Sequence, residues 1–270
     1  MCATCGCTDD LREMGERGDL GELDLLSHDH DHGHDHDHGH DHDHGHEHAH
    51  DGRTVTLQQK ILAKNDDLAQ RNREWLRDRG ILAVNLMSSP GSGKTTLLER
   101  TSQDLAGKLA LSVIEGDQET ALDADRIRSA GSEVVQINTG SGCHLDAAMV
   151  ARALRTLDPP AGSAVVIENV GNLVCPALFD LGETARVVLA SVTEGTDKPL
   201  KYPQMFRSAD LVVITKTDLV PYVNFDVAQF GEYVGQVGPR AMMISLSAVT
   251  GSGTGSWYDW LTSMIAAPAH

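Results

Sequence analysis

Short apolar runs alternate with helical stretches over most of this chain, from residue 54 onward. The apolar runs predict buried strands at 81–87, 110–114, 134–137, 164–167, 187–192, 211–214 and 242–246. Apolar residues at helical spacing predict helices at 54–79, 95–107, 121–130 and 145–157, and a closing helix with Trp257, Trp260, Leu261 and Ile265. Continuously apolar strands separated by helices are typical of a parallel sheet covered on both faces. We therefore expect an α/β fold.

The first 53 residues have a different composition. They contain 15 Asp and Glu against 3 Lys and Arg, a net charge of −12, whereas residues 54–270 carry −5 of the chain's total of −17. Twelve of the fourteen histidines lie at every second position between His28 and His50, in a low-complexity run dominated by Asp, Gly and His. Such a run cannot build a core. We predict a disordered metal-binding tail over 1–53 and one globular domain over 54–270.

The same composition argues against several classes of protein. An acidic chain without a basic stripe is not expected to bind nucleic acid, and no run approaches the ~20 apolar residues of a membrane helix. The first seven residues have neither the basic nor the apolar region of a secretory signal, and five cysteines are an odd number for a disulfide framework. We expect a cytoplasmic protein whose clustered thiols are metal ligands or redox groups.

A phosphate-binding loop follows the first predicted strand. The segment from Ser88 to Thr96 is SSPGSGKTT and leads into a predicted helix. In this context, successive backbone N–H groups and the helix N-terminus surround phosphate oxygens, a Lys neutralises phosphate charge and a hydroxyl binds Mg²⁺. Ser88 stands where the pattern usually has glycine. The residues expected to hold the nucleotide phosphates are Gly91, Ser92, Gly93, Lys94, Thr95 and Thr96.

Two acidic residues near the ends of predicted strands are candidates for ordering Mg²⁺ or its waters. Asp117 follows the second predicted strand, and Glu168 follows the fourth. Glu168 opens the segment Glu-Asn-Val-Gly, in which Gly171 is placed to donate its N–H to a γ-phosphate. For each carboxylate the alternative is an acidic residue at the start of a solvated loop. The predicted catalytic set is Lys94, Thr95, Asp117, Glu168 and Gly171.

Guanine selection is predicted from the Thr-Lys-Thr-Asp segment after the sixth predicted strand. The carboxylate of Asp218 can accept hydrogen bonds from N1–H and N2–H₂ of guanine, whereas adenine would leave a buried carboxylate unsatisfied. The stem of Lys216 can lie along the base, and Ser247 and Ala248 fit the loop that closes over it. Thr215 replaces the more usual Asn without removing the discriminating Asp. We predict GTP rather than ATP.

Three thiols near the N-terminus, those of Cys2, Cys5 and Cys7, form a compact potential ligand set. With the α-amino group of residue 2 after removal of Met1, they suit square-planar Ni²⁺ or tetrahedral Zn²⁺; free surface thiols are the alternative. The imidazoles of the His-rich run suit the same metals in many weak storage sites, and a purely solubilising acidic tail is the alternative. The storage ligands are His28, His30, His32, His34, His36, His38, His40, His42, His44, His46, His48 and His50.

A third group of thiols and imidazole lies inside the predicted domain. Cys143 and His144 precede the predicted helix at 145–157, and Cys175 lies four residues beyond Gly171. Two buried cysteines and a loop histidine are as often simple packing as a metal site. Their segments are connected to the phosphate-sensing loops, so the ligand geometry of a metal site here would change with GTP hydrolysis. The residues alone leave both interpretations open.

Together these motifs resemble the hydrogenase nickel-incorporation GTPases (HypB-type), of the signal-recognition-particle-like and MinD-like P-loop class. The resemblance covers the whole chain: the N-terminal Cys-x-x-Cys-Gly-Cys, the His-rich run, and residues 88–96, 115–118, 142–145, 168–176, 191–203 and 215–219. It implies a metallochaperone that delivers Ni²⁺ to the precursor of the [NiFe]-hydrogenase large subunit. Slow GTP hydrolysis, a GTP-dependent homodimer and other hydrogenase maturation factors as partners are implied with it.

The resemblance also implies two metal sites. The N-terminal thiols would hold Ni²⁺ tightly, and Cys143, His144 and Cys175 would form a weaker Ni²⁺ or Zn²⁺ site shared at the dimer interface. We hypothesise that γ-phosphate contact through Gly171 shifts Cys175 relative to the other two ligands.

Three alternatives compete with this function. Urease-accessory GTPases, which have Cys-Pro-His in place of adjoining Cys143 and His144 and lack the N-terminal thiol cluster, are the alternative within the class. A nickel or zinc storage protein with a regulatory nucleotide site and a small-molecule nucleotide kinase are the alternatives outside it.

Overall fold

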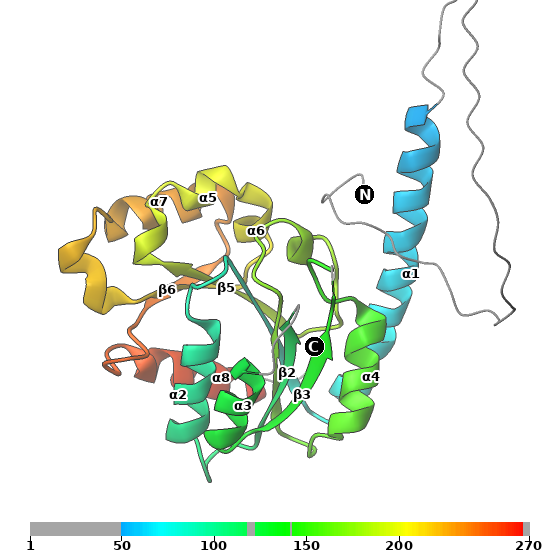
Figure 1. The fold of residues 1–270 in the computed structure, drawn as a ribbon, viewed down its shortest axis with the longest axis horizontal. Helices are drawn as coiled ribbons and strands as arrows, with labels where there is room; N and C mark the ends of the chain where they lie inside the picture. The colour runs from blue at the N-terminus through cyan, green and yellow to red at the C-terminus, as the bar shows by residue number, and fades with distance from the viewer. Residues whose placement is uncertain (1–49, 118–121, 141, 267–270) are drawn as a thin grey trace, which may run out of the picture.

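The computed structural model of the chain describes residues 50–117, 122–140 and 142–266. A seven-stranded sheet in the order β3-β2-β4-β1-β5-β6-β7 runs through it, and every pair of neighbouring strands is parallel. The strands are β1 (Leu82–Ser88), β2 (Leu111–Asp117), β3 (Glu133–Asn138), β4 (Ala164–Glu168), β5 (Ala185–Ser191), β6 (Leu211–Thr215) and β7 (Met242–Ser245). The predicted parallel α/β fold is confirmed (Figure 1).

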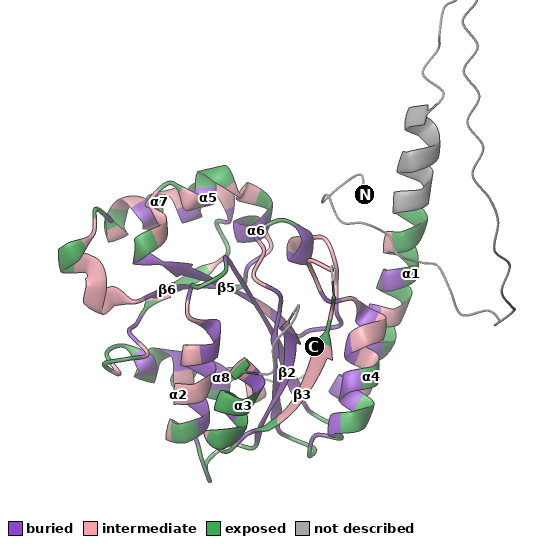
Figure 2. Ribbon diagram, viewed as in Figure 1, coloured by how far each residue is buried: buried purple, intermediate pink, exposed green. Residues whose placement is uncertain are grey.

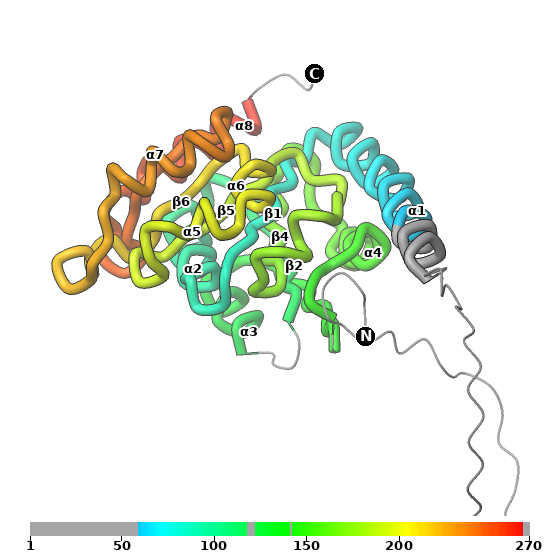
Figure 3. Tube along the Cα trace, turned by 90° about the horizontal axis from the view of Figure 1, so that it is seen from above, coloured from blue at the N-terminus to red at the C-terminus, as the bar shows by residue number. Residues whose placement is uncertain are grey.

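Helices cover both faces of the sheet, as Figures 1 and 3 show. The α-helices are α1 (His50–Asp78), α2 (Lys94–Asp104), α3 (Leu122–Ser129), α4 (Ala147–Leu157), α5 (Lys198–Lys201), α6 (Pro203–Arg207), α7 (Val227–Val237) and α8 (Thr254–Ala266). Three short 3₁₀ helices complete the described part of the chain: η1 (Cys175–Ala177), η2 (Val192–Glu194) and η3 (Thr217–Tyr222).

Alternation along the strands divides the core into two layers, because successive side chains of a strand point to opposite faces. On β1, Val84 and Leu86 pack in the layer formed with α2 and α8, whereas Ala83 and Met87 pack on the other face, against α1 and α4 or against α6 and α7. The strands of the sheet's interior are buried on both faces and appear purple in Figure 2. Continuously apolar strand sequences follow from this double burial.

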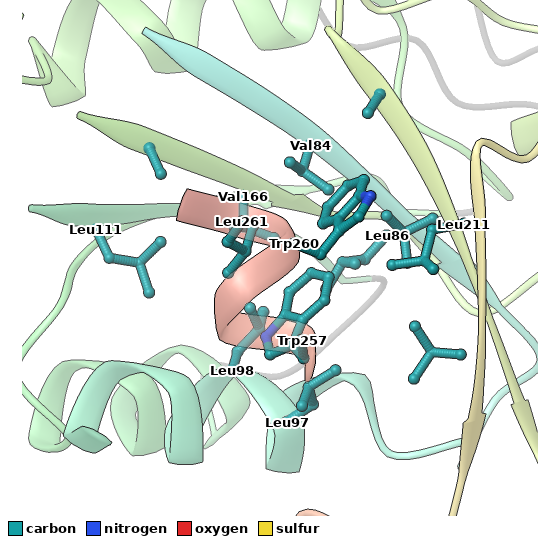
Figure 4. Close-up of a cluster of buried hydrophobic side chains, with 14 of the residues drawn as sticks. Val84, Leu86, Leu97, Leu98, Leu111, Val166, Leu211, Trp257, Trp260 and Leu261 are labelled. Atoms are coloured by element: carbon teal, nitrogen blue, oxygen red, sulfur yellow. The ribbon is translucent and has the colours of Figure 1, made fainter. Parts of the chain in front are cut away.

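Helix α8 closes the first layer with two tryptophans (Figure 4). Trp257 and Trp260 stack with their ring centroids 5.5 Å apart, and Trp257 donates its indole N–H to Thr101 Oγ1 at 3.0 Å. Burying a large aromatic with its polar group satisfied avoids the cost of an unpaired donor. The closing helix therefore holds α2, and with it the loop that precedes α2.

Several predicted boundaries differ from the observed ones for local reasons. Asp117 and Glu168 are the last residues of β2 and β4 rather than loop residues, because they still pair with Asn138 and Glu115 of the neighbouring strands. The predicted helix at 145–157 begins at Ala147, since Asp146 is its N-cap and its side chain accepts a hydrogen bond from the Met149 N–H at 2.7 Å. The sequence pattern did not predict α5, α6 or α7.

Helix α1 spans the predicted boundary between residues 53 and 54 and docks through buried amides. Asn65 and Asn72 make hydrogen bonds to backbone groups of α4 and of the segment before β5. The rest of the predicted tail, with Cys2, Cys5, Cys7 and the histidines from His28 to His48, lies outside the described residues, as does the side chain of His50. Within the described part, no helix combines the length and apolarity needed to cross a bilayer.

Candidate nucleotide and metal site

The carboxyl ends of β1, β2 and β4 meet at a cavity of about 410 Å³. Parallel strands place their carboxyl ends on one edge of the sheet, which is where open α/β folds bind ligands. The loop between β1 and α2 forms one wall, and the ends of β2 and β4 form the floor. Residues that line the cavity include Gly91, Lys94, Thr95, Asp117, Glu168 and Gly171. The whole predicted catalytic set is therefore brought to one place.

The loop from Ser88 to Thr96 has the geometry that its glycines allow. Gly91 and Gly93 have φ of 72° and 99°, in the region that disfavours a side chain, and α2 begins directly after Gly93 at Lys94. Lys94 is only 8% exposed, and its ammonium group donates to Ser88 Oγ at 3.0 Å. Burial lowers the pKa of Lys94, although the surrounding carboxylates oppose the shift. An incoming phosphate would therefore meet a largely desolvated cation.

Glu168 lies beside the first turn of α2. Its Oε1 accepts the hydroxyl of Thr95 at 2.8 Å, while its buried Oε2 has no hydrogen-bond partner in the structure. Burial raises the pKa of Glu168 to about 7, against the opposing effect of Lys94. A hydroxyl and carboxylates are the hard oxygen donors that Mg²⁺ prefers, so Thr95, Glu168 and the neighbouring Asp117 fit a magnesium ion held with its waters.

Sequence reasoning missed a third acidic residue on this floor, Glu115 of β2. It is the register partner of Glu168 on β4, so both side chains lie on the same face of the sheet. Glu115 is buried, its Oε2 has no hydrogen-bond partner in the structure, and burial with Glu168 nearby raises its pKa to about 8. The available signal was an acidic residue inside an otherwise apolar strand.

A second, smaller cavity of about 130 Å³ lies beyond the phosphate loop and is lined by the predicted base-binding residues. Lys216 has a φ of 58° and donates its ammonium to the carbonyl oxygen of Gly91 at 2.7 Å. Asp218 Oδ1 is buried without a hydrogen-bond partner in the structure, which leaves an acceptor for the N–H groups of guanine. The remaining lining residues include Ser92, Gly93, Thr96, Ser247 and Ala248.

Cys143, His144 and Cys175 converge on one another, with their potential ligand atoms all within 4.8 Å. The two sulfurs lie 2.9 Å apart, and Cys143 Sγ lies 3.5 Å from His144 Nδ1. Cys143 is half-buried rather than buried as expected, whereas Cys175 is buried. Burial lowers the pKa of His144, which favours the neutral imidazole that binds metals. Two thiols and an imidazole suit Ni²⁺ or Zn²⁺.

An aromatic ring outside the predicted set positions the histidine of this cluster. The ring of Phe179 stacks on that of His144, with centroids 3.9 Å apart and planes inclined by 24°. Such a stack restricts the imidazole to one orientation. The sequence offered no signal for this contact, because α4, β4 and η1 separate Phe179 from His144 along the chain.

The metal cluster and the phosphate cavity are joined by the buried side chain of Asn169. Its Oδ1 accepts the backbone N–H of Leu145, next to His144, at 3.2 Å, and its Nδ2 donates to Asn85 Oδ1 on β1 at 3.2 Å. Asn169 directly follows Glu168. Two residues further on, Gly171 packs so closely on the phosphate loop that a Cβ would lie 2.9 Å from Pro90 Cα. One short segment therefore touches both sites.

Comparisons with known proteins find related sequences. The sequence pattern of a family described as "CobW/HypB/UreG, nucleotide-binding domain" matches residues 82–245. A hydrogenase maturation factor HypB from Rhizobium leguminosarum bv. viciae is 53% identical over 77% of this chain and 70% of that protein. A hydrogenase/urease maturation factor HypB from Helicobacter pylori is 44% identical over 73% of this chain and 82% of that protein.

Two solved structures resemble the fold. The crystal structure of a HypB from Archaeoglobus fulgidus superposes with a TM-score of 0.71 at 43% identity and covers 76% of this chain and 100% of that one. A crystal structure of a HypB from Helicobacter pylori in complex with nickel gives a TM-score of 0.71 at 40% identity, over 75% of this chain and 95% of that one.

Proposed function

The chain belongs to the CobW/HypB/UreG family of nucleotide-binding domains and, within it, to the HypB-type hydrogenase maturation factors, and from this membership we propose its function. The protein is a GTP-hydrolysing nickel metallochaperone that serves the maturation of a [NiFe]-hydrogenase large subunit. One observation connects that function to this chain's own residues: the cluster of Cys143, His144 and Cys175 is tied to the phosphate cavity through Asn169.

In the proposed mechanism the loop between β1 and α2 holds the phosphates. Backbone N–H groups from Gly91 to Thr96 and the ammonium of Lys94 bind the phosphate oxygens, and the N–H of Gly171 meets the γ-phosphate. Thr95, Asp117 and Glu168 would hold Mg²⁺, directly or through its waters; when bound, the ion neutralises charge that develops on the phosphates. Asp218 selects guanine, with Lys216, Ser247 and Ala248 around the base.

Nickel is the cargo of this mechanism. Cys143, His144 and Cys175 receive Ni²⁺, and Zn²⁺ competes because the same donor set suits both ions. In the tail, Cys2, Cys5 and Cys7 form the tight Ni²⁺ site, and the twelve histidines of the His-rich run are weak storage ligands.

Nucleotide state controls the cargo site through one segment. A γ-phosphate that draws Gly171 inward moves the chain that runs from Glu168 to η1, which carries Cys175 at its start. Cys143 and His144, by contrast, precede α4 on a different loop. The ligands therefore belong to two segments that respond differently to GTP and GDP, which is the condition for a nucleotide-gated metal affinity.

A metal titration tests this function. Full-length protein and a Cys2/Cys5/Cys7→Ala variant are titrated with Ni²⁺ and Zn²⁺ after loading with GDP or a non-hydrolysable GTP analogue. We expect the variant to lose one tight Ni²⁺ site and to retain a weaker site whose affinity differs between the two nucleotides. Adding Cys143→Ser to the variant removes the remaining site. A weaker site with the same metal affinity in both nucleotide states would contradict nucleotide control of that site.

The finer features of the mechanism belong to the same proposal. GTP hydrolysis to GDP and phosphate is slow, GTP promotes a homodimer that shares the cargo site, and the protein works in the cytoplasm with the hydrogenase large-subunit precursor and other maturation factors. Transfer of the γ-phosphoryl group to water, rather than to another acceptor molecule, distinguishes this enzyme from a nucleotide kinase. Nickel binding without any GTP turnover would instead indicate a storage protein.

Urease maturation is the second candidate, and a specific observation favours it. The similar protein from Helicobacter pylori is described as a hydrogenase/urease maturation factor. Activation of both enzymes is measured in a host deleted for its own nickel-insertion GTPases. Restored hydrogenase activity alone supports the first function, and restored urease activity supports the second.

A further inference from the structure

The hydroxyl of Thr215 bridges the base-binding segment and the phosphate loop. Thr215 is the last residue of β6 and is only 3% exposed. Its Oγ1 donates to the carbonyl oxygen of Ser92 at 2.7 Å, across 123 residues of sequence. Lys216 makes a parallel contact with the carbonyl oxygen of Gly91. Two successive residues therefore fix the base-binding segment to the loop that holds the phosphates.

A threonine hydroxyl has a single proton to donate. In this chain Thr215 donates that proton to the carbonyl oxygen of Ser92, a residue that is completely buried. Turning the hydroxyl toward another acceptor would leave the Ser92 carbonyl without this partner, a loss comparable to the hydrogen bond gained. Thr215 can therefore accept a hydrogen bond from a bound base, but it has no proton left to give.

The proton matters because guanine presents only acceptors on the edge that carries N7 and O6. The opposite side of the base, with N1–H and N2–H₂, faces acceptors, and Asp218 supplies an unpartnered carboxylate oxygen for it. N7 requires a donor. An Asn at position 215 would have two N–H groups, one for Ser92 and one for the base; Thr215 has only the first.

We propose that this chain recognises guanine without a hydrogen bond from position 215 to N7, so that it accepts guanine nucleotides in which N7 is absent as readily as ordinary ones. The inference rests on the proposed guanine site and adds that this site tolerates the loss of N7. Specificity then comes from the N1–H and N2–H₂ groups at Asp218. Thr215 is a positioning residue that holds the base-binding segment in place through Ser92.

The experiment compares two ligands that differ at one atom. Full-length protein is freed of nucleotide, and the affinities for GDP and 7-deaza-GDP are measured by calorimetry in the presence of Mg²⁺, with ADP as a reference. We expect GDP and 7-deaza-GDP to bind within about threefold of each other. A loss of more than threefold for 7-deaza-GDP overturns the inference while leaving the guanine site intact. Failure of GDP to bind more tightly than ADP overturns the guanine site as well.

Two variants of Thr215 test whether the preference between GDP and 7-deaza-GDP depends on the donors at this position, which a purely structural role would not affect. Thr215→Asn supplies a second donor, so it should prefer GDP over 7-deaza-GDP by about 3- to 10-fold, the range of one net hydrogen bond. Thr215→Ser keeps one proton and should show no preference, as in the parent chain. A folded Thr215→Asn protein that binds both ligands equally would overturn the assignment to this position; the parent-chain comparison decides the inference if that variant does not fold.

Discussion

Replacing Asn169 with Ala should both destabilise the domain and remove the coupling between the phosphate cavity and the cluster of Cys143, His144 and Cys175. The change removes the acceptor of the Leu145 and Val170 N–H groups and the donor to Asn85 Oδ1, all of which are buried. A buried polar group without its partner costs about 1–3 kcal/mol. Three such groups, each at the lower end of this range, lower the free energy of unfolding by about 3 kcal/mol, which for a domain of this size lowers Tm by roughly 6–12 °C.

The second effect is on the cargo site. Leu145 is adjacent to His144, and Asn169 is adjacent to Glu168, so the lost hydrogen bond is the direct connection between the cluster and the phosphate cavity. We expect the ratio of Ni²⁺ affinities in the GTP-analogue and GDP states to fall toward one in Asn169→Ala. Urea denaturation gives the stability, and Ni²⁺ titration of the Cys2/Cys5/Cys7→Ala background gives the ratio.

Asn65→Ala is the matched control for this experiment. The buried Asn65 likewise makes two long-range hydrogen bonds, donating to Asp180 O and accepting from the Ala147 N–H, but it lies on α1, outside the phosphate cavity. Its loss should destabilise the domain to a similar extent and leave the ratio unchanged. If Asn169→Ala keeps the parental ratio, or if both variants lose it equally, the connection through Asn169 is refuted.

Three further predictions concern the phosphate cavity, the base-binding cavity and the metal cluster. Burial and the nearby Glu168 raise the pKa of Glu115 to about 8, so folding takes up a proton between pH 5 and 8, and the free energy of unfolding without nucleotide falls as pH rises through that window. Glu115→Gln should flatten this fall when stability is measured by urea denaturation at several pH values; an unchanged slope would contradict the prediction. Asp218→Asn should weaken GDP binding about 100-fold and improve binding of xanthosine diphosphate, whose C2 carbonyl accepts from an amide, as calorimetry would show; retained preference for GDP would contradict it. Phe179→Ala should weaken Ni²⁺ binding about 3- to 10-fold by freeing the His144 ring, whereas Phe179→Tyr should not; equal titrations for both variants would contradict it.

Local patterns predicted the strands well because each is a mostly apolar run between polar segments. All seven predicted strands correspond to observed ones, with ends that differ by a few residues. Helices α5 and α6 were not predicted, since at four and five residues they are too short for a periodic pattern. Helix α7 carries Gly231 and Gly235 in its interior, and glycine is a weak helix former.

The residues of the candidate site divide in the same way. Lys94, Thr95 and Asp218 were predicted because each belongs to a short segment whose chemistry depends on residues next to it in sequence. Glu115 and Asn169 were not, because their importance comes from partners far away in sequence: Glu168 for the first, and Asn85 and Leu145 for the second. Nothing in the residues beside them indicates those partners.

The sequence by itself determined which chemical groups are available: a phosphate-loop motif, a carboxylate predicted to bind guanine, and thiols with imidazoles that suit borderline metals. Only the tertiary structure decided which of them meet. Cys143 follows β3 and Cys175 follows β4, and the strand order β3-β2-β4 places both loops at the carboxyl edge, on either side of β2. Hydrophobic patterns specify strands, but strand order depends on how the connecting helices pack across the sheet. That packing brings two sulfurs 32 residues apart in sequence to 2.9 Å.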